Sequence, residues 1–265
     1  MAVRAVTGPY QDADAAGTLP DLCARVNAAS HAFFLDVDGT LLDLAPHPDA
    51  VVMPEGLPAT LDALFHRSGG ALALVSGRAL ASLDALFGSS FPAAGSHGAQ
   101  MRIRAGAGSW SAAPLAPDLA AAIRAVAGAI AGVFAEDKGT SIAVHYRAVP
   151  EAAPRLAEAL HRLVAGREDV RLLPGHCVFE VRRAGHDKGT ALESFMAGAP
   201  FAGRTPVFIG DDVTDEAGFR AATARGGLAI AVGAPRAGAD VVLPGPEAVR
   251  AYLSHLAAEP RQHWR

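Results

Sequence analysis

Several features that mark whole classes of protein are scarce or missing in this 265-residue sequence. It has only two cysteines, Cys23 and Cys177, which lie far apart and show no metal-ligand spacing. We interpret both as reduced thiols of a cytoplasmic protein rather than as a disulfide. No apolar run approaches the roughly 20 residues that a membrane-spanning helix needs. Residues 1–21 lack the hydrophobic core of a signal peptide, so we expect a loose or short helical lead-in there.

Basic tracts and paired histidines are missing as well. The net charge is -4 and no segment is strongly basic, which argues against nucleic acid as the main partner. The ten histidines show no paired ligand spacing, which argues against a zinc site. Apolar residues make up 51% of the chain, enough for a sizeable core in one large domain or two modest ones. We expect a monomer or a weak homo-oligomer that does not bind membranes.

Short apolar runs alternate with helical patterns at both ends of the chain. The runs predict strands at residues 32–36, 71–75, 93–98, 206–209, 228–232 and 241–243. The intervening patterns predict a helix at residues 57–67 and another that follows residue 78 and ends near residue 87. Strands that alternate with helices of this length are typical of βαβ units, so we predict an α/β fold with a doubly wound sheet.

The middle of the chain has a different pattern. It predicts strands at residues 101–104, 141–146 and 177–182 and helices at residues 117–134 and 150–166. This α+β block interrupts the βα pattern, so we predict a smaller inserted domain at residues 104–183 and a core formed by residues 1–103 and 184–265. Insertions at strand ends commonly act as lids or specificity elements.

The first apolar run of the core ends at two aspartates. Phe33–Leu35 leads into Asp36 and Asp38, and Gly39 and Thr40 follow at once. In open α/β sheets, ligands bind at the carboxyl ends of the strands. Two carboxylates this close repel each other unless a cation or a shared proton relieves them, and Mg²⁺ is a cation that favours oxygen ligands. The alternative is an ordinary turn, since Asp and Gly are common turn formers.

Two further segments offer groups that suit a phosphate. Ser76 provides a hydroxyl, Gly77 allows close approach of the backbone, and Arg78 follows where a helix is expected to begin. The alternative is an ordinary serine N-cap. Lys188 lies at the start of a predicted helix, where its charge opposes the helix dipole, and this suggests an anionic target. A solvated surface lysine is the alternative.

The last segment of this kind is Gly210–Glu216, which directly follows a buried strand. It holds three aspartates in five residues, Asp211, Asp212 and Asp215, a costly cluster if it is buried without a cation. Acids in the first turn of a helix would account for Asp215 and Glu216, but less well for the residue at the strand end. Together the four segments predict a phosphoryl-transfer site with a carboxylate nucleophile, a second carboxylate for the leaving-group proton, and Mg²⁺.

The order of these motifs resembles that in the haloacid dehalogenase-like phosphatases. Asp-x-Asp-Gly-Thr, Ser-Gly-Arg, Lys-Gly and Gly-Asp-Asp-x-x-Asp agree in identity and order, and they cover both ends of the chain. This resemblance implies a Rossmann-like core with an inserted α+β cap and an aspartyl-phosphate intermediate. Three segments also resemble the trehalose-6-phosphate phosphatase family: Gly95–Ala99, Glu136–Arg147 and Gly210–Glu216.

The resemblance also implies roles for individual residues. Asp36 would be the nucleophile and Asp38 the general acid and base, with Lys188 as a further catalytic residue. Asp36, the main-chain carbonyl of Asp38, and Asp211 would hold Mg²⁺, with Asp212 and Asp215 in support. The residues implied in substrate binding are Ser76, Gly77, Arg78, His97, Glu136, Lys138 and Glu180. From the residues alone, the alternative to sugar binding by Glu136 and Lys138 is that they form a solvated ion pair.

The activity that this resemblance implies is hydrolysis of trehalose 6-phosphate to trehalose and phosphate, the last step of trehalose biosynthesis. One alternative is a related phosphatase acting on another sugar phosphate, such as sucrose phosphate. Alternatives from other classes are a phospho-aspartate receiver domain and a phosphosugar-binding regulator without activity. Asp38 argues against the receiver domain, which does not need an acid two residues after the nucleophile.

Overall fold

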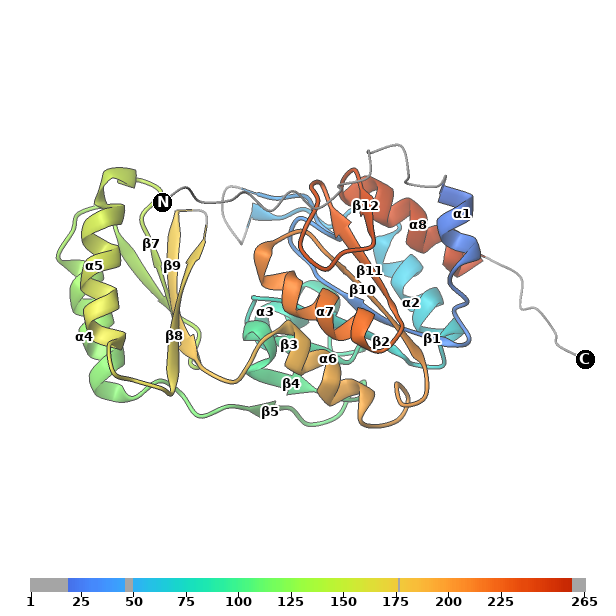
Figure 1. Ribbon diagram of the computed structural model, residues 1–265, viewed down its shortest axis with the longest axis horizontal. Coiled ribbons are helices and arrows are strands. Elements are labelled where there is room, and N and C mark those ends of the chain that lie inside the picture. The colour runs from blue at the N-terminus through green and yellow to red at the C-terminus, as the bar shows by residue number, and fades with distance from the viewer. Residues whose placement is uncertain (1–18, 46–49, 176, 259–265) are drawn as a thin grey trace, which may run out of the picture.

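The chain forms two sheets of different kinds, seen in a computed structural model that describes residues 19–45, 50–175 and 177–258 (Figure 1). Most of the predicted lead-in lies outside the described residues, and its end forms the short helix α1 (Leu19–Ala24). The strands of the larger sheet, in order across it, are β12 (Val241–Leu243), β11 (Leu228–Val232), β10 (Thr205–Gly210), β1 (His31–Leu35), β2 (Leu72–Val75), β3 (Ala93–Gly95), β4 (Gln100–Arg102) and β5 (Trp110–Ser111). The pairs from β12 to β3 are parallel, and β4 and β5 extend that edge antiparallel.

Helices cover both faces of this sheet, which is therefore doubly wound as predicted. One face is covered by α1, α2 (Leu57–Arg67), α3 (Leu80–Phe87) and α8 (Pro246–Ala258). The other face is covered by α6 (Lys188–Met196) and α7 (Glu216–Ala224). Such a sheet is buried on both sides, which explains why its central strands are continuous apolar runs in the sequence.

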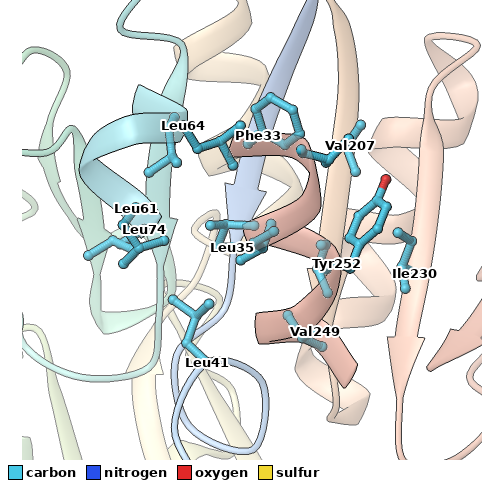
Figure 2. Packing of buried hydrophobic residues seen from close by; sticks show 14 of the residues in the cluster. Phe33, Leu35, Leu41, Leu61, Leu64, Leu74, Val207, Ile230, Val249 and Tyr252 are labelled. Carbon is cyan, nitrogen blue, oxygen red and sulfur yellow. The ribbon is translucent and has the colours of Figure 1, made fainter. Parts of the chain in front are cut away.

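β1 illustrates how successive residues serve the two faces. Phe33 and Leu35 point toward the side of α2 and α8, where Leu64 and Tyr252 lie around them (Figure 2). Phe34 points the other way and packs with the helices of the opposite face. All three β1 side chains are fully buried, and each contributes about 1.5–3 kcal/mol to the free energy of unfolding. This burial holds β1, and the loop that follows it, in a fixed place.

The connections of the sheet create a crevice between β1 and β10. These two strands are neighbours, but the chain continues from β1 to β2 and β3 on one side and from β10 to β11 and β12 on the other. Ligands of open α/β sheets bind at such a switch point, beyond the carboxyl ends of the strands. Asp36 follows the end of β1 and Asp211 follows the end of β10, so two of the predicted functional aspartates flank the crevice.

The smaller sheet forms a cap beside the core. Its antiparallel strands, in order across it, are β6 (Phe134–Asp137), β7 (Ser141–His145), β9 (Val178–Arg183) and β8 (Val170–Gly175). The helices α4 (Pro117–Gly128) and α5 (Ala153–Val164) cover the sheet face that is turned away from the core (Figure 1). The alternate residues Ile142, Val144 and Val181 pack against these helices. The residues between them, such as Glu180, therefore lie on the face toward the core.

The structure differs from the sequence-based expectations mainly around the cap. The helix predicted at residues 117–134 ends at Gly128, because the chain turns at Gly132 (φ 82°) and then forms β6. β5, β6 and β8 were not predicted. β5 pairs with β4 of the core, although the predicted inserted segment at residues 104–183 would include it. The smaller sheet and its helices span only Pro117–Arg183.

Two smaller expectations can be compared with the structure directly. Cys23 and Cys177 are not joined in a disulfide, which agrees with the interpretation of both as reduced thiols. Within the described part of the chain, none of the helices combines the length and apolar character needed to cross a membrane.

Candidate active site

The crevice between β1 and β10 places Asp36 and Asp211 side by side. Asp36 is 4% exposed, and its main-chain N–H donates to Ile209 O at 2.9 Å, which ties the loop after β1 to β10. Thr40 Oγ1 lies 3.3 Å from Asp36 Oδ2 and 3.5 Å from Asp211 Oδ1. The loop after β1 needs a glycine at position 39, because Gly39 has φ 75° and a Cβ there would lie 2.2 Å from Asp211 Oδ2.

Lys188 lies beneath these carboxylates rather than on the surface, so the surface alternative is wrong. It is 2% exposed, and its Nζ donates to Asp36 Oδ1 and to Asp215 Oδ1, both at 2.6 Å. Asp187 and Thr190 form a capping box that fixes the start of α6 and therefore the position of the lysine. Burial alone would lower the pKa of Lys188, but Asp215 and Asp36 raise it above its usual range.

Three carboxylates meet at this point with one lysine between them. Asp36, Asp211 and Asp215 each offer an oxygen, and these oxygens all lie within 4.8 Å of one another. Burial and the charges of its two acidic neighbours raise the pKa of Asp211 to about 8. Burial also raises the pKa of Asp215, to about 7, although Lys188 opposes that shift. One ammonium group does not offset three carboxylates, and these hard oxygen donors fit a divalent cation.

Asp38 points to a different partner. Arg78 binds its carboxylate through two bonds, from Nε to Oδ2 at 2.7 Å and from Nη2 to Oδ1 at 2.6 Å. Ser76 is buried, and its Oγ accepts from the main-chain N–H of Arg78 at 3.2 Å. The serine does not cap α3, which begins at Leu80 and has Ala79 as its N-cap. The segment predicted to hold phosphate therefore lies in the loop before the helix, next to Asp38.

One acidic side chain of the cap, Glu180, reaches a residue of the core. Glu180 Oε1 accepts from Ser141 Oγ at 2.7 Å and lies 3.8 Å from Lys138 Nζ. Its Oε2 lies 3.3 Å from Nε2 of His97, a residue of the core. Burial alone would raise the pKa of Glu180, but His97, Lys138 and Ser141 together bring it well below its usual range. Glu136 lies on the same sheet face, across Ala143 from Glu180.

Residues 34–240 match the family model described as trehalose-phosphatase, which is more than half of the chain. The chain belongs to the trehalose-phosphatase family. A probable trehalose-phosphate phosphatase of Sinorhizobium fredii (strain NBRC 101917 / NGR234) is 44% identical over 231 residues, which cover 85% of this chain and 87% of that protein. The trehalose-6-phosphate phosphatase of Escherichia coli (strain K12) is 38% identical over 238 residues, covering 89% and 90%.

Solved structures of the family share the fold. The C-terminal domain of trehalose-6-phosphate phosphatase from C. albicans superposes with a TM-score of 0.79, covering 91% of this chain and 98% of that one, at 22% identity. The expected α/β fold, with the Rossmann-like core of haloacid dehalogenase-like hydrolases, is therefore confirmed. The match to the trehalose-phosphatase family confirms the resemblance found in the sequence.

Several of the residues that the trehalose-phosphatase resemblance singled out lie in clusters in the structure. Asp36, Asp211 and Lys188 lie together, and Asp38 lies with Arg78. In the cap, the predicted trio is divided. Lys138 and Glu180 lie close to each other, whereas Glu136 binds His145 Nε2 at 2.9 Å.

Sequence reasoning gave Asp215 only a supporting place. The structure puts it in the centre of the cluster, where it is 0% exposed and binds Lys188. Gly210 makes this possible, since a Cβ there would lie 2.2 Å from Asp215 Cγ. Gly210 and Asp215 can both be seen in the sequence, but no residue pattern marks the turn that folds Asp215 back beneath the end of the strand. Acids in the first turn of a helix are common without any such role.

Proposed function

We propose that this member of the trehalose-phosphatase family hydrolyses trehalose 6-phosphate to trehalose and phosphate, with Mg²⁺ as its metal. The observation that carries the proposal is the contact of buried Lys188 with Asp36 inside a cluster of three carboxylates. The similarity to proteins named as trehalose-phosphate phosphatases, over most of both chains, supports the choice of substrate. We place the reaction in the cytoplasm, as the last step of trehalose biosynthesis, in a monomer or a weak homo-oligomer.

In this proposal, Asp36 attacks phosphorus while the bond from phosphorus to the sugar oxygen breaks. Asp38 leaves Arg78, takes up a proton from solvent, and gives that proton to the leaving sugar oxygen. Water then attacks the phosphorus of the aspartyl phosphate, the bond from phosphorus to the Asp36 oxygen breaks, and phosphate leaves, while Asp38 takes a proton from that water. Lys188 holds Asp36 in position and offsets charge on the phosphate oxygens. Ser76 and Gly77 contact the phosphate from the loop after β2.

Asp36, Asp211 and the main-chain carbonyl of Asp38 would hold the Mg²⁺, and Asp215 lies close enough to support them. The bound ion would supply positive charge against the carboxylates and the phosphate. In the cap, Glu136, Lys138 and Glu180 would bind sugar hydroxyls through charge-assisted hydrogen bonds, which are stronger than neutral ones. Cap and core would thus recognise different ends of the substrate.

Phosphate release from trehalose 6-phosphate, sucrose 6-phosphate and p-nitrophenyl phosphate tests this proposal. With Mg²⁺ present, we expect release from trehalose 6-phosphate to be fastest, because only that substrate engages both the core and the cap fully. With EDTA in place of Mg²⁺, we expect release to fall at least about 100-fold, since metal charge stabilisation is worth several kcal/mol.

Other results of that experiment would count against the proposal in different ways. Faster release from sucrose 6-phosphate would contradict the choice of substrate but leave the phosphatase core intact. Equal release with EDTA and with Mg²⁺ would contradict the metal assignment. No release from any substrate would favour the phosphosugar-binding alternative.

A further inference from the structure

His97 lies in the core but its ring reaches a residue of the cap. It belongs to the short turn η3 (Ser96–Gly98) that follows β3. Its Nε2 lies 3.3 Å from Glu180 Oε2, and both side chains are almost buried, at 11% and 12% exposed. Desolvated hydrogen bonds of this kind to a charged partner are stronger than exposed ones. His97 is therefore a physical link between the core and the sugar-facing side of the cap sheet.

The core holds this ring in a fixed place beside the phosphate loop. The main-chain N–H of His97 donates to Ser76 O at 2.9 Å, and that of Ser96 donates to Arg78 O at 2.7 Å. A Cβ on Gly77 would lie 2.7 Å from His97 Cε1 and Nε2, so the loop leaves room for the ring only because residue 77 has no side chain. The ring and the segment proposed to contact phosphate are packed as one unit.

The backbone of this turn also has a form that few sequences adopt without a reason. Ser96 has φ 48° and His97 has φ 54°, both in the left-handed region that L side chains rarely occupy. Such conformations persist only where the surroundings fix them. Gly98 makes the turn still tighter, because a Cβ there would lie 2.9 Å from Asp187 O, next to Lys188. The turn thus touches both groups proposed to hold phosphate, the loop after β2 and the start of α6.

Glu180 depends on this link for its placement. Ser141 and Lys138 approach Oε1 from within the cap, whereas His97 is the core residue at Oε2. Without the imidazole, the carboxylate would keep its partners in the cap but lose the contact that sets its position relative to the core. A displacement of about 1 Å in a substrate-positioning group is enough to reduce a reaction rate strongly.

We propose that His97 is a positioning residue that sets Glu180 relative to the phosphate loop, so that the cap contacts the sugar at a fixed distance from the phosphate held by the core. This inference rests on the proposed function, since it needs Glu180 to contact the sugar. It replaces direct contact of His97 with the substrate, the role implied by the sequence resemblance, with an action through Glu180. His97 thereby contributes to selectivity for the phosphosugar and not to the phosphoryl-transfer step itself.

A double-mutant cycle of His97→Asn and Glu180→Ala tests the inference, because each change removes the contact between the two side chains. Asparagine tolerates the left-handed backbone but is too short to reach the glutamate. We expect His97→Asn to lower kcat/KM for trehalose 6-phosphate about tenfold, mainly through KM, and to lower kcat/KM for p-nitrophenyl phosphate by a clearly smaller factor. In the Glu180→Ala background, His97→Asn should add less than about a twofold loss, because its partner is already absent.

Two results would overturn the inference. Equal losses in both backgrounds would mean that His97 acts without Glu180, and an equal loss with p-nitrophenyl phosphate would mean a merely structural role. The control is His66→Asn, an exposed histidine of α2, which should change neither substrate's turnover. Full turnover of p-nitrophenyl phosphate by His97→Asn would also show that this variant is folded.

The wild-type protein distinguishes a failure of this inference from a failure of the proposed function. If it prefers another sugar phosphate, the proposed substrate is wrong, and the same cycle measured on the preferred substrate still decides the role of His97. If it hydrolyses every sugar phosphate no better than p-nitrophenyl phosphate, Glu180 selects no sugar and the inference is wrong as well.

Discussion

Asp36→Asn is expected to lower kcat for trehalose 6-phosphate by at least about a thousandfold, as loss of a covalent nucleophile typically does. Asparagine has almost the shape of aspartate, and its amide oxygen can still accept from Lys188 while its NH2 group faces the Thr40 hydroxyl. The amide is a poor nucleophile toward phosphorus. Phosphate release under saturating substrate, with Mg²⁺, measures the effect. The variant should stay folded, because it removes one charge from a cluster in which like charges repel.

Asp62→Asn provides a matched control for this variant. Asp62 is exposed on α2 and contacts only His66 among the ion pairs of the described residues, so its replacement should leave kcat unchanged within about twofold. Turnover by Asp36→Asn within tenfold of the wild type would rule out the covalent mechanism. The proposal would then have to assign another group, or water itself, as the nucleophile.

Lys188→Met is expected to abolish activity and to lower the free energy of unfolding by about 3 kcal/mol, measured by denaturant titration in EDTA. Removing one partner of a buried ion pair typically costs about 3–5 kcal/mol, because the remaining charge stays buried. Here the loss leaves Asp36 and Asp215 without their common cation. Mg²⁺ should restore part of the lost stability, since a ligand that binds only the folded state stabilises it.

The chain offers one matched lysine for comparison. Lys138 lies 3.8 Å from Glu180, which keeps His97 and Ser141 as partners when the lysine is replaced. Lys138→Met should therefore cost less stability than Lys188→Met. If Lys188→Met unfolded at the same denaturant concentration as the wild type, the account of the buried cluster would be wrong. If it kept full turnover, Lys188 would have no part in the reaction.

The strands of the core could be predicted because each of them is marked by a continuous apolar run in its own segment of the sequence. Strands of a parallel sheet that is covered on both faces are continuous apolar runs, so 228–232 and 241–243 were predicted at the residues where β11 and β12 lie. The helix at 57–67 was also predicted at its observed bounds. These signals are local, and no knowledge of the partner strands was needed to find them.

Two of the cap strands, β6 and β8, were not predicted because their signals are not local, whereas β7 and β9 were predicted. β6 has only four residues, none of them buried, and becomes a strand through its pairing with β7. β8 contains Pro174, which argues against a strand except at the edge of a sheet, the place that β8 occupies. Both strands are fixed by their neighbours, and those neighbours cannot be identified from the segments themselves.

In the active site, too, one part could be predicted from the sequence and another could not. The order of the motifs was enough to single out Asp36, Lys188 and Asp211, because each follows a strand end or begins a helix. The contacts that join distant segments were not predicted: the bidentate contact of Arg78 with Asp38, the burial of Asp215, and the link from His97 to Glu180. These contacts depend on how the loops fold above the sheet. They cannot be found by reading the residue pattern of each segment separately.

The ratio of kcat/KM for trehalose 6-phosphate to that for glucose 6-phosphate, measured with Mg²⁺ on the wild-type protein, tests the central claim most directly. Both substrates carry the same phosphorylated ring, and only the first has a second ring. If cap and core each recognise one end of the disaccharide, we predict a ratio of at least about 100, as two or more hydrogen bonds to charged groups would give. A ratio near one would contradict the assignment of this protein to trehalose 6-phosphate.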